Sequence, residues 1–218
     1  MASKDQLVTL IDDLKKNSGE RKFLESFEIA VNMKEIDLSD PKNRINEEII
    51  LPKGRGKELK VALIGTAEMQ QKGKDGTDLI YGPEDISKFA ENKREFKKLA
   101  NGIEFFVAES TLMANIGKSL GTVLGPRGKI PKPLPPGQDP NPVITSLKRT
   151  VRARSRDRRT FHVPVGTKEM SSADLAENIR AVVKRIVGRL EKGYGNLDSV
   201  YLKPTMGKAV KIELEMME

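Results

Sequence analysis

The sequence contains no cysteine, no tryptophan and only one histidine among its 218 residues. Without cysteine the chain forms no disulfide, holds no thiolate-bound metal and has no thiol nucleophile. The lone histidine, His162, does not supply the ligand set of a transition-metal centre, and its place in a predicted strand favours a structural role. The sequence therefore predicts no catalytic residue, no metal site and no cofactor.

Long apolar runs are missing as well. No segment approaches the ~18 consecutive apolar residues of a transmembrane helix, and the N-terminus lacks the apolar core of a signal peptide. We therefore expect a cytoplasmic protein without membrane contacts. Aromatic residues form only 5% of the chain, which is too few for the stacked-ring platforms that bind single-stranded nucleic acid.

Positive charge, in contrast, is abundant and unevenly placed. The formal net charge is +8, and residues 148–159 hold seven cations and a single acid, Asp157. Six of these cations are arginine, whose planar guanidinium matches phosphate oxygens in a two-pronged contact. Together with the few aromatic rings, this favours a protein that contacts folded RNA through phosphate and 2′-hydroxyl groups. Within the segment we expect Arg154, Arg156 and Arg158 to bind RNA.

Two other classes of protein fit the sequence less well. Gly117-Lys118-Ser119 resembles the end of a phosphate-binding P-loop, but the required first glycine falls at Leu112. No G-x-G-x-x-G motif follows the apolar run at residues 60–66, so a nucleotide-dependent α/β enzyme is disfavoured. The charge allows a DNA-binding protein, although no helix-turn-helix or zinc motif is visible.

The spacing of apolar residues predicts an alternation of helices and strands. Phe27, Ile29, Val31 and Met33, for example, alternate with polar neighbours, as in a half-buried strand. The predicted strands are 27–33, 49–51, 60–66, 78–81, 103–108, 160–165, 198–203 and 209–214, and the predicted helices are 4–16, 83–99, 110–120, 143–151 and 171–190.

This order of elements predicts an α/β fold in two domains. The middle part alternates strand and helix, which favours a small parallel sheet with helices on both faces. Neither end of the chain has enough strands for a stable sheet of its own. We therefore predict that residues 1–59 and 153–218 form one discontinuous α+β domain, into which residues 60–152 are inserted as an α/β domain.

The most informative segment is Leu124-Gly125-Pro126-Arg127-Gly128-Lys129-Ile130-Pro131-Lys132-Pro133. Its two glycines and three prolines predict a shaped loop that presents Arg127, Lys129 and Lys132 to an anionic surface. The same segment resembles the signature of the family of large-subunit ribosomal protein one. Further resemblances to that family, in the same order along the chain, are found at residues 23–29, 51–57, 161–166, 175–179, 199–201 and 205–207.

The chain is thus similar to this family, and its segments at 133–142 and 161–163 resemble the archaeal type. The resemblance implies a structural constituent of the large ribosomal subunit that binds large-subunit rRNA. Members form the mobile stalk beside the tRNA exit site, assist release of deacylated tRNA and repress translation of their own mRNA. A split α+β domain with an inserted Rossmann-like, three-layer α/β domain is the fold implied, and a monomer is expected off the ribosome.

The resemblance also implies which residues bind RNA. It places the main RNA surface on the discontinuous domain, at Phe23, Ser26, Glu28, Ser199, Thr205, Met206 and Gly207. The hydroxyl groups of Ser199 and Thr205 suit contacts with RNA 2′-hydroxyls. Phe23 and Met206 offer apolar surface, and Gly207, which has no side chain, lets the protein backbone lie close to the RNA. The signature residues Gly125, Pro126, Arg127, Gly128 and Lys129 fall on the inserted domain, where we expect them to face tRNA or to set contacts between the domains.

Overall fold

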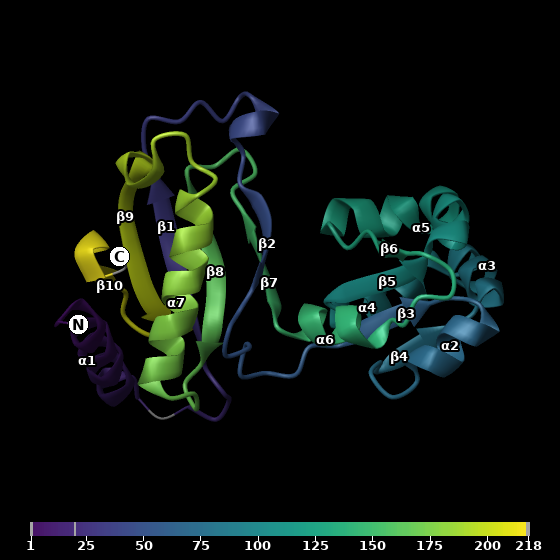
Figure 1. The fold of residues 1–218 in the computed structure, drawn as a ribbon, viewed down its shortest axis with the longest axis horizontal. Helices are drawn as coiled ribbons and strands as arrows, with labels where there is room; N and C mark the ends of the chain where they lie inside the picture. The colour runs from purple at the N-terminus through teal and green to yellow at the C-terminus, as the bar shows by residue number, and fades with distance from the viewer. Residues whose placement is uncertain (1, 20, 217–218) are drawn as a thin grey trace. The chain divides into compact units, whose positions relative to one another are not determined.

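The computed structural model describes residues 2–19 and 21–216, and Figure 1 shows its helices and strands. The chain divides into two compact units, residues 1–57 with 149–218 (unit 1) and residues 58–148 (unit 2). The boundaries predicted at 59/60 and 152/153 lie slightly later in the chain. The shift has a physical reason, because β7 (Thr150–Arg154) pairs along its whole length with β2 (Asn46–Ile50) of unit 1.

Unit 1 is built around a four-stranded antiparallel sheet with the order β10-β9-β1-β8. The alternation predicted for β1 is confirmed, since Phe27, Ile29, Val31 and Met33 are buried and their neighbours are not. The strands are β1 (Ser26–Met33), β8 (Thr160–Thr167), β9 (Leu197–Pro204) and β10 (Val210–Ile212), and β2 and β7 form a separate two-stranded ribbon.

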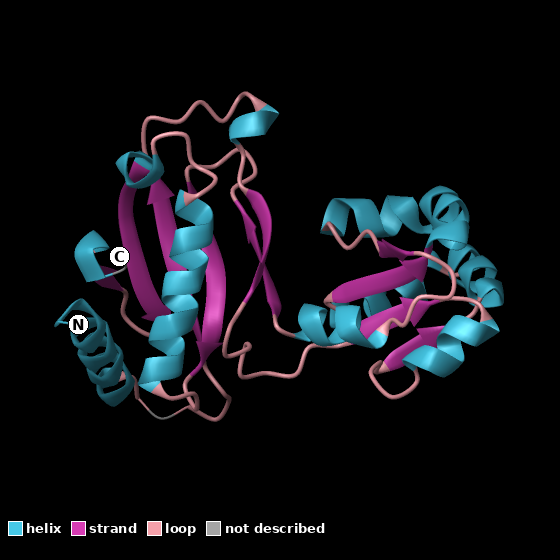
Figure 2. Cartoon of the chain, in the orientation of Figure 1, coloured by secondary structure: helices cyan, strands magenta, loops and turns pink. Residues whose placement is uncertain are grey.

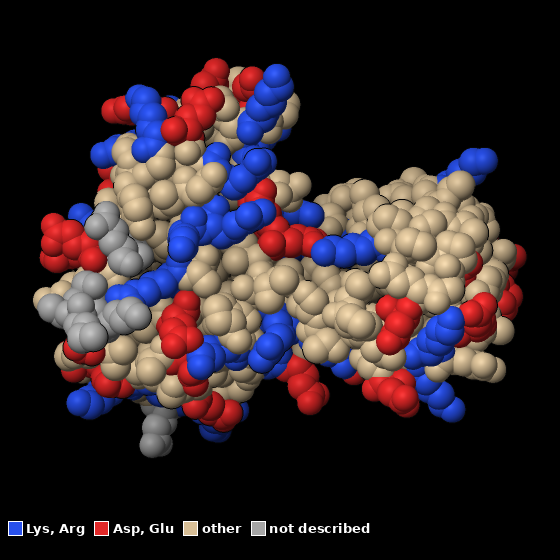
Figure 3. Space-filling view, in the orientation of Figure 1, with Lys and Arg blue, Asp and Glu red and all other residues tan. Residues whose placement is uncertain are grey.

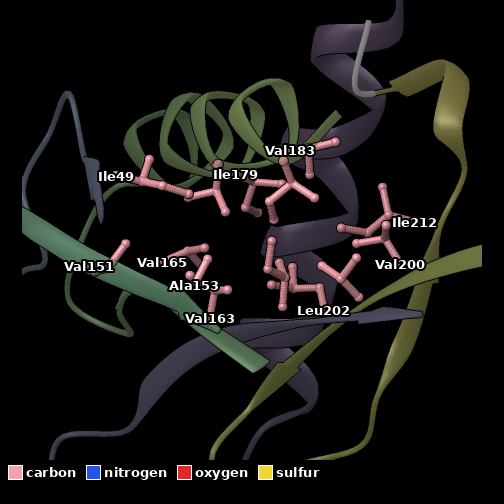
Figure 4. Close-up of a cluster of buried hydrophobic side chains, with 14 of the residues drawn as sticks. Ile49, Val151, Ala153, Val163, Val165, Ile179, Val183, Val200, Leu202 and Ile212 are labelled. Atoms are coloured by element: carbon pink, nitrogen blue, oxygen red, sulfur yellow. The ribbon is translucent and has the colours of Figure 1, made fainter. Parts of the chain in front are cut away.

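Two helices, α1 (Ala2–Asn17) and α7 (Ser172–Val187), cover one face of this sheet. Figure 4 shows Ile179 and Val183 of α7 above Val163 of β8 and Leu202 of β9. At the start of α7, the Ser171 hydroxyl accepts the Asp174 N–H at 3.1 Å and caps the helix. The polar residues of β1 point to the opposite face, which is the open face of the sheet.

Two family-like segments meet beside this core. The side-chain amide of Asn178, on α7, donates to the carbonyls of Gly54 and Val165, each at 2.8 Å. Its oxygen accepts the Lys53 N–H at 3.1 Å. Asn178 is fully buried, so these bonds tie the 51–57 turn to the sheet and explain why an amide is placed on a core-facing helix position.

Unit 2 is a three-layer α/β unit around a parallel sheet with the order β4-β3-β5-β6. Alternate residues of β3 and β5 enter two separate cores, Ala62 and Phe106 on one face and Leu63 and Phe105 on the other. The predicted α/β fold is confirmed. The strands are β3 (Val61–Ile64), β4 (Leu79–Tyr81), β5 (Phe105–Glu109) and β6 (Lys132–Leu134), and the helices are α2 (Ala67–Gly73), α3 (Pro83–Glu91), α4 (Lys93–Gly102), α5 (Met113–Arg127) and α6 (Asn141–Lys148). Figure 2 distinguishes these helices and strands by colour.

The predicted loop at the signature segment is wrong. Helix α5 continues through Gly125, Pro126 and Arg127, and it ends at Gly128, which has a left-handed backbone (φ +63°). The Lys129 N–H donates to the Leu124 carbonyl at 2.9 Å and the Gly128 N–H to the Gly125 carbonyl at 2.8 Å. This pair of bonds is the Schellman ending of a helix, for which glycine is the favoured residue.

Other differences from the predicted elements concern their ends. The helix predicted at 83–99 is two helices, because Asn92 leaves the helical conformation and its side chain caps α4 by accepting the Glu95 N–H at 3.3 Å. The helix predicted to reach Val151 stops at Lys148, where β7 pairing takes over. Helix α2 and strands β6 and β7 were not predicted. In the described part of the chain no helix has the length and apolar character to cross a membrane.

Candidate RNA-binding surface

The open face of the unit 1 sheet carries a row of partly exposed polar side chains. In the middle strand they come from β1, and the strand register sets their neighbours on either side. Residues directly opposite one another in antiparallel strands share a face. The open face therefore consists of Glu28, Ala30 and Asn32 of β1, Lys203, Tyr201 and Ser199 of β9, Pro164, His162 and Thr160 of β8, and Lys211 of β10.

One part of the open face is a hydrogen-bonded chain centred on Asn32. The Asn32 amide nitrogen donates to the Ser199 hydroxyl at 2.9 Å, and the Thr160 hydroxyl donates to the Asn32 amide oxygen at 2.8 Å. Only 7% of Ser199 is exposed. Its hydroxyl is thus held in place by the protein, and a ligand would meet a preformed row of polar groups rather than freely rotating ones.

A second part is centred on the Glu28 carboxylate. The Lys203 ammonium lies 3.4 Å from it, and the Nδ1 atom of His162 lies 3.8 Å from the same oxygen. Lys203 offsets the negative charge of Glu28, so an anionic backbone is not repelled at this point. The carboxylate keeps lone pairs that are able to accept from a 2′-hydroxyl or a base amine.

The hairpin between β9 and β10 closes one end of the open face. The Thr205 hydroxyl donates to the Ser26 carbonyl at 3.0 Å and accepts the Ser26 N–H at 3.2 Å, while the Thr205 N–H donates to the same carbonyl at 2.9 Å. Three bonds therefore fix the hairpin to the first residue of β1. A side chain at Gly207 would come within 2.2 Å of Pro204, so this tight turn requires glycine.

Large apolar side chains are exposed around this hairpin. Met206 is 63% exposed and Phe23 is 53% exposed. Cavities beside the two residues share Arg21 and Glu25 in their walls. The hairpin, Ser26 and the segment that carries Phe23 thus form one surface, which we name the hairpin end.

The arginine residues lie at the other end of β1. Thr160, at the start of β8, pairs with Asn32, whereas Thr167, at its end, pairs with Ser26. The turn that precedes β8 therefore lies at the opposite end of β1 from the hairpin end. The length of β1 separates the two, about 23 Å at ~3.3 Å per residue. In this turn Arg156 has a left-handed backbone (φ +52°), and Arg156 and Arg158 are exposed. We name it the arginine turn.

Arg154 differs from these two arginines. Its Nε donates to the Asn46 side chain at 3.0 Å, on the neighbouring strand β2. Burial, followed by the neighbouring cation Arg152, lowers the pKa of the Arg154 guanidinium from its ordinary value. Arg154 is therefore anchored on the two-stranded ribbon, whereas Arg156 and Arg158 extend from the turn.

The signature residues lie in unit 2, and Arg127 and Lys129 do not project as predicted. The Arg127 Nε donates to the Asn101 side chain and its Nη1 to the Val123 carbonyl, both at 3.0 Å. The Lys129 ammonium donates to the carbonyls of Ala100, Asn101 and Ile103. A lysine that binds the last carbonyls of a helix stabilises its C-terminus. Here the signature joins the end of α5 to the end of α4.

In unit 2 the Glu109 carboxylate lies at the carboxyl end of the parallel sheet, where open α/β sheets commonly bind their ligands. The sheet order changes direction between β3 and β5, and ligands of open α/β sheets bind beyond the carboxyl ends of such strands. In unit 2 the Glu109 carboxylate accepts the Thr66 N–H at 3.0 Å, the Thr66 hydroxyl at 2.8 Å and the Thr111 hydroxyl at 2.9 Å. These bonds, the Thr66 N–H first, lower the pKa of Glu109.

Sequence patterns alone did not single out several residues of the open face. Asn32, Tyr201 and Lys203 belong to it only because three strands, far apart in the sequence, pair in register. The sequence could have indicated them through the polar residues that alternate with apolar ones in each predicted strand, since alternate residues of β1 face away from the core.

The face of unit 1 that carries α7 has a different character. Figure 3 views unit 1 from this side, where acidic and basic side chains are mixed.

The sequence profile of the ribosomal protein L1p/L10e family matches residues 14–208. The chain belongs to this family. A protein of Picrophilus torridus named large ribosomal subunit protein uL1 is 64% identical over 203 residues, which cover 93% of this chain and 95% of that protein. Proteins of the same name from Thermoplasma volcanium and Methanocella arvoryzae are 59% and 49% identical, with 93% and 88% of this chain covered and 93% and 91% of theirs.

These findings confirm the resemblance seen in the sequence, including its archaeal type. The family consists of structural, non-enzymatic ribosomal proteins. This chain is therefore not an enzyme. The Glu109 site disfavours one particular alternative, a nucleotide-dependent enzyme, because a fixed carboxylate at the strand ends would repel a nucleotide phosphate.

Proposed function

We propose that this L1 protein is a structural constituent of the large ribosomal subunit in the cytoplasm and binds large-subunit rRNA through unit 1. The observation that carries the proposal is the open sheet face, which ends in exposed apolar side chains at the hairpin end and in exposed arginines at the arginine turn. Its span of about 23 Å matches a folded RNA better than a single phosphate group, and its polar row suits sugar and base edges.

The residues proposed to bind RNA have different tasks. Arg156 and Arg158 neutralise phosphates, while Glu28 and Lys203 offer an acceptor and a donor to sugars and bases. Phe23 and Met206 supply apolar contacts, and Gly207 allows close approach of the RNA backbone. Ser26, Thr205 and Ser199 hold these groups in place through the bonds described above, and Arg154 supports the arginine turn.

The proposal extends to the family's further roles. The protein forms the mobile stalk beside the tRNA exit site, where unit 2 faces deacylated tRNA and assists its release. It also represses translation of its own mRNA by binding a structure that imitates the rRNA site. Repression requires that one RNA surface on unit 1 bind rRNA and mRNA alternately.

The test is binding of the purified chain to transcribed large-subunit rRNA, followed by nuclease footprinting. We expect protection of one folded region, competition by the leader of the protein's own mRNA and no competition by duplex DNA at matched salt. Equal competition by duplex DNA would contradict the proposal. A nucleotide titration serves as the control for the enzyme alternative, since a stabilisation above ~1 kcal/mol by a nucleotide would revive it.

A further inference from the structure

Glu25, immediately before β1, is a buried carboxylate with unsatisfied hydrogen-bonding capacity. Only 2% of the residue is exposed, and neither carboxylate oxygen has a partner among the described residues. Burying a polar group without a partner is unfavourable, and for a carboxylate the cost is large. Its place at the hairpin end, beside the proposed RNA surface, points to a ligand that brings the missing donors.

The backbone holds Glu25 firmly in this position. The Glu25 carbonyl accepts the Lys168 N–H at 3.0 Å, at the end of β8. The next residue, Ser26, is bound to Thr205 of the hairpin through three hydrogen bonds. The backbone at Glu25 is therefore anchored between two strands, whereas no hydrogen bond among the described residues fixes its side chain.

A cavity of about 650 Å³ is lined by Glu25, by the end of α1 and by the hairpin. Pro204, Met206 and Gly207 form its hairpin side, and Arg21 and Lys208 bring positive charge to its wall. The volume is in the range of pockets that hold small ligands. Its walls thus combine an apolar surface and two cations, and Glu25 is one of the residues that line it.

We propose that this cavity receives an unpaired guanine of the bound RNA and that Glu25 accepts from its N1–H and N2–H groups. The inference rests on the proposed function, since the guanine belongs to the RNA. Among the four bases, the Watson–Crick edge of guanine alone presents two adjacent donors, which match the two oxygens of a carboxylate. Adenine, cytosine and uracil each present an acceptor beside the donor, so one oxygen would face a lone pair.

The surrounding residues fit the rest of a nucleotide. Met206 and Pro204 supply apolar contact for the base, and Arg21 and Lys208 suit its phosphate. Entry requires rotation of the Glu25 side chain to bring its oxygens to the cavity wall, for which its three rotatable bonds are sufficient. The base must be unpaired, because pairing would occupy the same edge.

The test combines a protein variant with a base analogue. Footprinting identifies the unpaired guanines protected by the wild-type chain, and each is replaced in turn by inosine, which lacks only the N2 amino group. We expect one replacement to weaken wild-type binding about tenfold, and Glu25→Gln to weaken binding of the unmodified RNA by at least as much. The Glu25→Gln chain should then bind the inosine RNA no more weakly than the guanine RNA. Glu213→Gln, an exposed change beyond β10, is the matched control.

Three outcomes would overturn the inference while leaving the proposed function intact. They are unchanged rRNA affinity of the Glu25→Gln chain, independent and additive effects of the variant and the inosine, and undiminished wild-type binding after every replacement of guanine by inosine. Failure of the wild-type chain to bind rRNA would instead contradict the proposed function itself. Circular dichroism of each variant establishes that a loss of binding is not a loss of folding.

Discussion

At the residue scale, the hydroxyl of Thr205 has a structural task as well as a proposed contact with RNA. From sequence, a hydroxyl at a hairpin tip is expected to contribute little to stability. The structure shows it bonded to both backbone groups of Ser26. We therefore expect Thr205→Ala to lower the free energy of unfolding by about 1 kcal/mol and to weaken rRNA binding, because the hairpin loses its fixed position.

Thr205→Ser is the matched comparison, since it keeps the hydroxyl and removes only a methyl group. Urea denaturation and rRNA binding at fixed salt should place the serine variant close to the wild type in both measurements. If the alanine variant were as stable as the wild type yet bound rRNA weakly, the hydroxyl would act on the RNA directly and not through the hairpin.

Glu109 gives a prediction about pH. Its hydrogen bonds lower its pKa in the folded chain below the ordinary value of 4.5, so the ionised carboxylate stabilises unit 2 at neutral pH. This contribution is present above the unfolded pKa and is lost as the pH falls through the lower folded value. We expect Glu109→Gln to reduce the free energy of unfolding by about 1–3 kcal/mol at pH 7.

The difference between the wild type and Glu109→Gln should shrink as the pH is lowered through the acidic range. Urea denaturation of both chains at several pH values measures it. Glu104→Gln, at the opposite end of β5, tests whether loss of a negative charge from unit 2 alone is enough. A difference that stays constant from pH 7 into the acidic range would mean that the ionised form of Glu109 is not the stabilising one.

At the scale of elements, hydrophobic periodicity predicted the four strands of the unit 1 sheet and helix α7, because each has one buried face, but it missed strand β7. It failed at the signature segment for a physical reason. Glycine and proline commonly indicate a loop, yet Pro126 occupies the last turn of α5 and Gly128 is the left-handed residue that ends a helix. Likewise Asn92, a good helix cap, divides an apolar pattern that otherwise continues through α3 and α4.

The arginine turn provides a prediction about salt dependence. Neutralising Arg154, Arg156 and Arg158 together should weaken rRNA binding and flatten its dependence on salt, by a slope of about 0.7–0.9 for each phosphate that the variant no longer neutralises. Because Arg154 is bonded to Asn46, most of the effect should come from Arg156 and Arg158. A salt titration of the triple variant and of each single variant measures these contributions.

The matched comparison is a variant in which Arg127, Lys129 and Lys132 of unit 2 are neutralised. It removes the same charge, so purely non-specific attraction would fall equally in both triple variants. We expect its rRNA affinity to remain nearly intact while unit 2 loses stability, because the bonds between Lys129 and the end of α4 are removed. A large fall in affinity here, with none from the arginine turn, would assign rRNA binding to unit 2.

At the scale of the whole molecule, sequence patterns predicted the class of surface better than its layout. The motifs that carry Ser26 and Thr205 are 179 residues apart, yet three hydrogen bonds join them. No local pattern reveals this pairing or places Arg156 at the opposite end of β1. Both depend on the register of long-range antiparallel strands, which arises only when the core of unit 1 is packed.

The discontinuous unit leads to a prediction about independent folding. The Leu51 N–H donates to the Arg149 carbonyl at 2.9 Å, so the two segments that connect unit 1 to unit 2 run side by side. Replacing residues 58–148 by a short linker should therefore leave a chain that folds and still binds rRNA. Residues 58–148 alone should fold without binding rRNA, since the open face, the hairpin end and the arginine turn all belong to unit 1.

The boundary itself matters in this experiment. A chain that joins residues 1–59 to 153–218 lacks Thr150, Val151 and Arg152, which pair with Ile50, Ile49 and Glu48 of β2. We expect it to unfold at lower denaturant than the chain joined at 57 and 149, because the ribbon that anchors Arg154 loses most of its pairing. Circular dichroism, urea denaturation and rRNA binding compare the two. If neither shortened chain folded, unit 1 would depend on unit 2, and the inserted unit would be part of one cooperative structure.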